Sequence, residues 1–176
     1  MRVLDHEWFC ARAEAEIALM ASVVSGAGLS VAVPTCPGWT IGRLVAHTGT
    51  VHRADAEAAL GAVPAVDPAV AADGIDEFLA NLPAARRPRE HLGSLPAGES
   101  LHLHATDCDG EWLIRFPGTA AGIDWSRGHA KASAAVRGPV GVLLLFTYGR
   151  VPGSDPRLTV FGEQSLLDAW QQKTAL

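Results

Sequence analysis

The sequence predicts an α+β protein with a helical first half and a second half built from a sheet and helices. Before residue 83, apolar residues recur every three or four positions, as in amphipathic helices. After residue 100 they alternate in short runs, as in strands. Residues 84–100 are dense in Pro, Gly and Arg, which indicates a linker. We therefore expect a helical domain over 1–83 and an α+β domain over 101–176.

Three helices are expected in the first half. The first covers residues 5–25, before the glycines at 26 and 28. The second covers residues 41–60, with Thr40 as its N-cap. The third covers residues 69–82, where Ile75 and Phe78 belong to its apolar stripe.

The second half should hold an antiparallel or mixed sheet. Asp109-Gly110 has the composition of a tight hairpin turn between the first two strands. Pro139 suits the first turn of a short apolar helix, where its missing N–H costs least. The strands are expected at 101–107, 111–116, 131–138 and 157–163, and the helices at 139–150 and 165–172.

Charge and composition exclude several classes of partner. The chain has 14 Lys plus Arg against 19 Asp plus Glu, a formal net charge of −5. This charge disfavours nucleic acid and anionic membranes. No run reaches the roughly 18 to 20 apolar residues of a membrane span, and the acidic start differs from a secretory signal. We expect a cytoplasmic protein, in which Cys10, Cys36 and Cys108 are reduced thiols.

Several segments resemble one family. VPTCPGWTIGRLVAHTGTVHR, over residues 33–53, is followed in order by LHLHATDCDGEW, ASAAVRGPVGVLLLFTYGR and LTVFGEQSLLDAW. Together they resemble the mycothiol-dependent maleylpyruvate isomerases. That resemblance implies a DinB-like helical bundle followed by a sterol-carrier-like domain. It also implies a divalent metal, usually zinc, that activates the thiol of mycothiol for cis–trans isomerisation.

The resemblance also implies a metal site in the helical half. His47 matches the family's histidine on the second helix, and His52 and Asp55 match the H-R-x-D part of its E-x-x-x-H-R-x-D segment. Thr48 stands where the family has Glu, so one ligand is missing. The two segments are adjacent here, as though the stretch between them had been removed. The bundle should therefore be incomplete.

Spacing gives a second view of these histidines. On one regular helix His47 and His52 would lie about 140° apart, too far to chelate one ion. His52 and Asp55 have i, i+3 spacing and could share an ion with a further residue such as His6. Otherwise one histidine is a partly buried polar side chain and the other is solvated. An incomplete bundle would expose an apolar face, so we expect a homodimer, which could bring His47 of one chain near His52 of the other.

Other polar residues have alternative interpretations. His102 and His104 share a strand face and could bind a metal with Asp107, although an exposed polar face is commoner. The resemblance makes Arg150, or Arg137, a candidate catalytic cation for substrate carboxylates. Arg150 could instead complement a helix dipole.

Three functions follow from these observations. The first is a metal-dependent, mycothiol-using isomerase or thiol transferase, with a small molecule or thiol as its partner. The second is a non-catalytic protein that binds a small molecule in an apolar pocket of the sterol-carrier-like domain. The third is a truncated relic. Cys36 is expected to be structural, within the Pro37-Gly38 turn.

Overall fold

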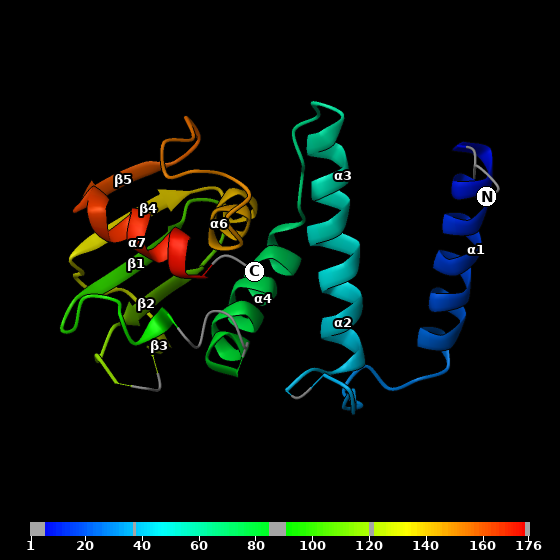
Figure 1. Ribbon diagram of the computed structural model, residues 1–176, viewed down its shortest axis with the longest axis horizontal. Coiled ribbons are helices and arrows are strands. Elements are labelled where there is room, and N and C mark those ends of the chain that lie inside the picture. Colours follow the sequence, from blue (N-terminus) through cyan, green and yellow to red (C-terminus); the bar gives the residue numbers. More distant parts are fainter. Residues whose placement is uncertain (1–5, 37, 85–90, 120–121, 175–176) are drawn as a thin grey trace. The chain divides into compact units, whose positions relative to one another are not determined.

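The chain forms two compact units, Met1–Val45 and Ala46–Leu176. The structure is a computed structural model that describes residues 6–36, 38–84, 91–119 and 122–174 (Figure 1). Within these residues, no helix is both long and apolar enough to cross a membrane. The domain boundaries expected from the sequence, at 83 and 101, stay a prediction.

The first unit consists of a long helix, an ordered turn and residues 41–45, which begin the next helix. Helix α1 covers His6–Ser25, and the expected start at Asp5 lies outside the described residues. The chain then closes a turn in which Ala32 and Thr40 form an isolated antiparallel bridge. The hydroxyl of Thr40 accepts a hydrogen bond from the backbone N–H of Arg43 at 3.3 Å, which confirms the expected N-cap.

The second predicted helix is not regular. It consists of α2 (Ile41–His47), η1 (Thr48–His52) and α3 (Arg53–Ala59), and η1 is a π-helical turn. A π turn has i→i+5 hydrogen bonds, so it takes more residues per turn than an α-helix. The regular 3.6-residue period expected over 41–60 is therefore wrong at η1.

The second unit is built on a five-stranded sheet in the order β3-β2-β1-β4-β5. The expected α+β class is confirmed, and the sheet is mixed: β1 and β4 are parallel and the other neighbours antiparallel. Strand β3 was not expected, because its short sequence DWSR is polar and mostly exposed. The strands are β1 (Ser100–Ala105), β2 (Glu111–Arg115), β3 (Asp124–Arg127), β4 (Ala134–Gly138) and β5 (Thr159–Gly162).

The turn between β1 and β2 is wider than the expected two-residue hairpin. The ladder ends where the N–H of Ala105 donates to the carbonyl of Gly110, at 2.8 Å. Beyond the ladder, a hydrogen bond attaches the loop to another part of the chain, because Oδ1 of Asp107 accepts from the N–H of Val140 at 2.8 Å. Gly110 is needed for space, because a Cβ there would lie 2.5 Å from the Trp112 ring. The pairing consequently places His104 opposite Glu111.

Helices pack on one another and on the sheet. Helix α4 (Pro68–Asn81) begins at Asp67, whose side chain accepts from two backbone N–H groups. It packs against α6 (Val140–Thr147), which is buried along most of its length. Helices α6 and α7 (Gln164–Thr174) contact the central strands, and a short 3₁₀ turn, η2 (Leu82–Ala84), follows α4.

The two faces of β1 differ. Leu101 and Leu103 are fully buried in the hydrophobic core, together with Trp112 on β2 and Trp170 on α7. Because side chains alternate along a strand, His102 and His104 lie on the opposite face. Glu111 on β2 lies opposite His104 and shares this face, which we call the polar face.

Candidate functional site

The predicted site residues of the helical segment lie together in the second unit. We call His47, His52, Asp55, Glu77, Tyr148 and Arg150 the helical cluster. The ring centroids of His47 and His52 are 5.3 Å apart. The expected divergence of about 140° assumed a regular helix, and the π turn corrects it. With i→i+5 bonding, residues five apart lie on the same side of the helix.

His47 points to two groups from other elements. Its Nδ1 lies 3.3 Å from the hydroxyl of Tyr148 and 3.8 Å from Oε1 of Glu77. Glu77 is on α4 with only 1% of its surface exposed. Burial lowers the pKa of His47, and the charges of His52 and Arg150 lower this pKa further. Burial also raises the pKa of Tyr148. The His47 imidazole is therefore neutral near pH 7.

Asp55 and Arg150 pair with each other. Oδ1 of Asp55 accepts from Nε of Arg150 at 3.0 Å, and Oδ2 accepts from its second terminal nitrogen at 3.2 Å. This paired arrangement is the strong geometry for Arg and carboxylate. The hydrogen bond from Arg150 lowers the pKa of Asp55. His52 lies 3.4 Å from the same carboxylate. Asp55, the predicted metal ligand, and Arg150, the predicted catalytic cation, therefore use much of their hydrogen-bonding capacity on each other.

The helical cluster encloses little space. The cavity beside His47, Glu77 and Tyr148 has a volume of about 10 Å³. A single water needs roughly 10 to 15 Å³ measured in this way. This cavity therefore has room for at most about one water molecule.

Other sequence candidates lie apart from the helical cluster. His6 contacts Cys10 on α1 at 3.5 Å. Arg137 lies on β4 beside His104 of β1. Asp107 caps α6 instead of approaching the sheet histidines. Cys36 lies in the turn before α2, and its N–H donates to the carbonyl of Val33 at 3.0 Å, which fits a structural role. No described cysteine is in a disulfide.

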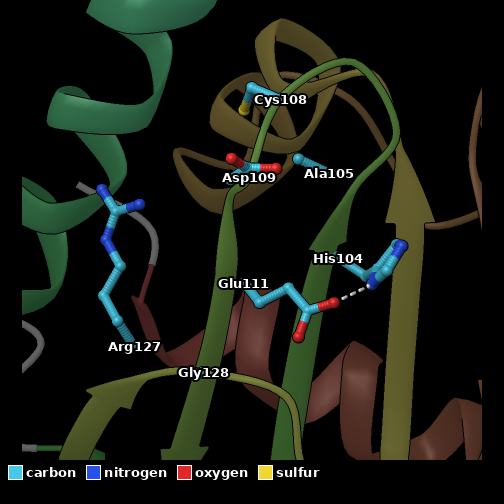
Figure 2. Close-up of a pocket in the computed structure, with 7 residues that line it drawn as sticks. All are labelled: His104, Ala105, Cys108, Asp109, Glu111, Arg127 and Gly128. Atoms are coloured by element: carbon cyan, nitrogen blue, oxygen red, sulfur yellow. Dashed lines mark ion pairs between the residues drawn. The ribbon is translucent and has the colours of Figure 1, made fainter.

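A larger hollow opens at the β1–β2 turn. Its volume is about 560 Å³, within the range of small-molecule sites. Figure 2 shows His104 and Glu111 projecting toward one another from adjacent strands, while Arg127 points toward α4. The His104 and Glu111 side chains are 2.7 Å apart. The lining is His104, Ala105, Cys108, Asp109, Glu111, Arg127 and Gly128.

Three site residues were missed from the sequence. Glu77 sits among apolar positions of α4, where a charge gives no sign of its partner. Tyr148 follows an apolar helix and carries no spacing signal. Glu111 was missed because a two-residue turn at Asp109-Gly110 would have paired His104 with Arg115 instead. The sequence signal at this turn therefore pointed to the wrong partner for His104.

The family of the chain follows from its second unit. The model of the family described as MDMPI C-terminal domain matches residues 69–169, more than half of the chain. The chain belongs to the maleylpyruvate isomerase family. The resemblance seen in the sequence is thereby confirmed for this family. The sequence matches no curated protein.

Two solved structures are similar to this maleylpyruvate isomerase family chain. One is titled "UbiJ-SCP2 Ubiquinone synthesis protein", with 14% identity and a TM-score of 0.45, covering 62% of this chain and 92% of that chain. The other is the stereoselective inverting sec-alkylsulfatase Pisa1 from Pseudomonas sp., with 14% identity and a TM-score of 0.44. It covers 57% of this chain and 16% of that chain.

The residues of this family member do not fit the family's zinc at the helical cluster. Zinc needs at least three donors that converge at about 2.0 to 2.3 Å from one point. In the part of the chain that the structure describes, no three donors of the helical cluster converge. His52 faces Asp55, and Asp55 is held by Arg150. Thr48, in place of the family's Glu, lies within η1.

Proposed function

We propose that this family member binds a small polar molecule in the hollow at the β1–β2 turn and does not perform thiol-dependent isomerisation at its helical cluster. One observation carries the second part: both oxygens of Asp55 are held by Arg150. A carboxylate so paired is a poor metal ligand, and a guanidinium so paired is a poor receptor for a substrate carboxylate. The hollow, by contrast, has room and polar groups.

The lining of the hollow favours one kind of ligand. Asp109 and Glu111 are hydrogen-bond acceptors, and Arg127 already donates to Asp76 on α4 at 2.9 and 2.6 Å. A dicarboxylate would meet two carboxylates and find the one lining guanidinium occupied. A molecule that donates hydrogen bonds, such as an alcohol, an amine or a polar thiol, suits this lining better. In this proposal, a hollow with a partly polar lining takes the place of the apolar pocket expected from the sequence.

Cys108 provides a test, because its half-buried thiol lines the hollow. The experiment measures alkylation of each cysteine by iodoacetamide, with mycothiol or maleylpyruvate as the added probe. Mycothiol should slow the labelling of Cys108 relative to Cys10 and Cys36, which serve as internal controls. Maleylpyruvate should not. Because mycothiol itself consumes iodoacetamide, the measured quantity is the ratio of Cys108 labelling to that of Cys10 and Cys36. An unchanged ratio on adding mycothiol would contradict the proposal.

Activity is tested separately. With maleylpyruvate, mycothiol and Zn²⁺ present, the chain should give no isomerisation above the uncatalysed rate. A rate that disappears in His47→Ala would contradict this part of the proposal.

A second candidate is a metal-dependent, mycothiol-using isomerase or thiol transferase. The observation that favours it is the π turn, which brings His52 near His47 while Glu77 lies 3.8 Å from His47. Two His and one Glu form a known catalytic zinc set. The His52 side chain is 60% exposed and would have to turn away from Asp55. This candidate predicts that the chain binds zinc and that His47→Ala abolishes zinc binding.

We also propose that the chain forms a homodimer. None of the residues of α1 is buried, and its exposed side chains include Trp8, Phe9 and Ile17. A homodimer would cover such apolar surface. Light scattering at micromolar concentration should give the dimer mass, and a monomer mass would contradict the proposal.

A further inference from the structure

Three potential metal ligands converge on the polar face of the sheet. We call His102, Glu111 and His129 the sheet cluster. One donor atom from each lies within 4.8 Å of the other two. Oε2 of Glu111 is 3.8 Å from Nε2 of His102 and 3.0 Å from Nδ1 of His129. Within the described ranges, no other group of three His, Cys, Asp or Glu converges in this way.

The fold fixes these positions through strand pairing. His102 and His104 are two residues apart on β1 and share a face. Glu111 begins β2 directly opposite His104. Gly128 follows β3 with φ +128°, a conformation that L side chains rarely adopt, and its N–H donates to the carbonyl of Glu111 at 3.1 Å. This turn directs the next residue, His129, back over the sheet.

His102 supplies an independent observation. It is only 4% exposed, and its Nε2 has no hydrogen-bond partner in the described part of the chain. Buried polar atoms are nearly always satisfied, so an exception calls for an explanation such as an ion. This nitrogen is directed at Glu111, beyond hydrogen-bonding distance. A metal between the two groups would satisfy both.

We infer that the sheet cluster binds a divalent transition-metal ion of the zinc class through Nε2 of His102, Nδ1 of His129 and the carboxylate of Glu111. Two His and one Glu, with a fourth position left for water or a ligand, is an established zinc set. Tetrahedral ligands at about 2.0 to 2.1 Å from zinc lie roughly 3.3 Å apart. None of the three donor separations exceeds 4.8 Å, so each needs to change by at most about 1.5 Å.

His104 is a positioning residue in this arrangement. Its Nδ1 lies 2.7 Å from Oε1 of Glu111, the oxygen that the contact with His102 does not use. Hydrogen bonds of this kind orient a ligating carboxylate.

This site differs from the one that the family resemblance implied, and it does not depend on the proposed ligand of the hollow. Its residues lie on β1, on β2 and just after β3, whereas His47 and His52 belong to the helical segment. Glu111 also lines the hollow, so the metal would border the space where a ligand is proposed. Zinc binding and Cys108 protection are separate measurements and can fail separately.

Titration of the chelator-treated full chain with Zn²⁺ tests the inference by calorimetry. The wild type should bind one Zn²⁺ per chain. His129→Ala should weaken binding at least tenfold, and it should fold normally because its side chain is 78% exposed. His91→Ala is the matched control at another exposed histidine and should bind like the wild type.

Two further variants make the result decisive. Glu111→Gln should also weaken binding at least tenfold, because the amide carries no charge for the ion. His47→Ala should leave zinc binding unchanged. Equal zinc affinity in His129→Ala and the wild type would overturn the inference. Loss of zinc in His47→Ala alone would also overturn it, and would support the helical cluster as the metal site.

Discussion

Helices α1 and α4 differ in what they bury, although both were expected from the same apolar spacing. Helix α1 has 20 residues and none is buried. Helix α4 has 14 residues and buries Ala71, Ile75, Glu77, Phe78 and Leu79. Apolar spacing predicts that a segment is helical, whereas the stability of the helix comes mostly from the surface against which it packs. The second unit provides that surface for α4 through α6.

The largest contrast should come from the same substitution in both helices. Ile75 is fully buried, whereas Ile17 is 69% exposed. Ile75→Ala should lower the free energy of unfolding by about 2 to 5 kcal/mol, through lost burial and a cavity. Ile17→Ala should change it by less than about 0.5 kcal/mol. Urea denaturation of both variants measures this, and equal losses would show that α1 has a packed partner in solution.

A smaller contrast is expected for the polar contacts of the two units. Asp76 on α4 accepts from Nε1 of Trp112 at 2.8 Å and from Arg127 at 2.6 Å, which ties α4 to the sheet. Asp76→Ala should cost about 1.5 to 3 kcal/mol, because it removes hydrogen bonds to a charged group. Arg12→Ala on α1 breaks only an exposed i, i+4 pair and should cost about 0.3 to 0.5 kcal/mol. Thermal denaturation of both variants tests the difference.

The smallest expected effect is a dependence of stability on pH, which arises from histidines of the second unit. The pKa values of His47 and His102 are lowered, chiefly by burial. Below the unfolded value of about 6.5, the unfolded chain therefore binds more protons than the folded chain. Stability should fall as pH drops from 7.5 to 5.5. In His47→Gln the fall should be shallower, as measured by unfolding midpoints, with His6→Gln on α1 as the matched control. An unchanged slope in His47→Gln would contradict this.

Most of the fold and part of the candidate site are predictable from the sequence. Helix α4 and strands β1, β2, β4 and β5 follow from local apolar periods. The closeness of His47 and His52 did not, because nothing in TGTVH distinguishes a π turn from an α-helix. The sheet cluster needed the correct pairing of β1 with β2. The Asp109-Gly110 pair suggested a two-residue turn and therefore another pairing. In the structure Gly110 is needed for a different reason, because a Cβ there would collide with the Trp112 ring.

The π turn η1 also sets the angle, around the helix axis, between the side chains that precede it and those that follow it. An α-helix accommodates one extra residue by widening into such a turn, and each residue is worth about 100° of rotation. Deleting one residue from Thr48–His52 would restore the regular period and swing His47 away from His52 and Glu77. The length of this segment is therefore as informative as its composition. In a relative of this chain, an insertion or deletion of one residue in this segment should separate the two histidines, even where both are present in its sequence.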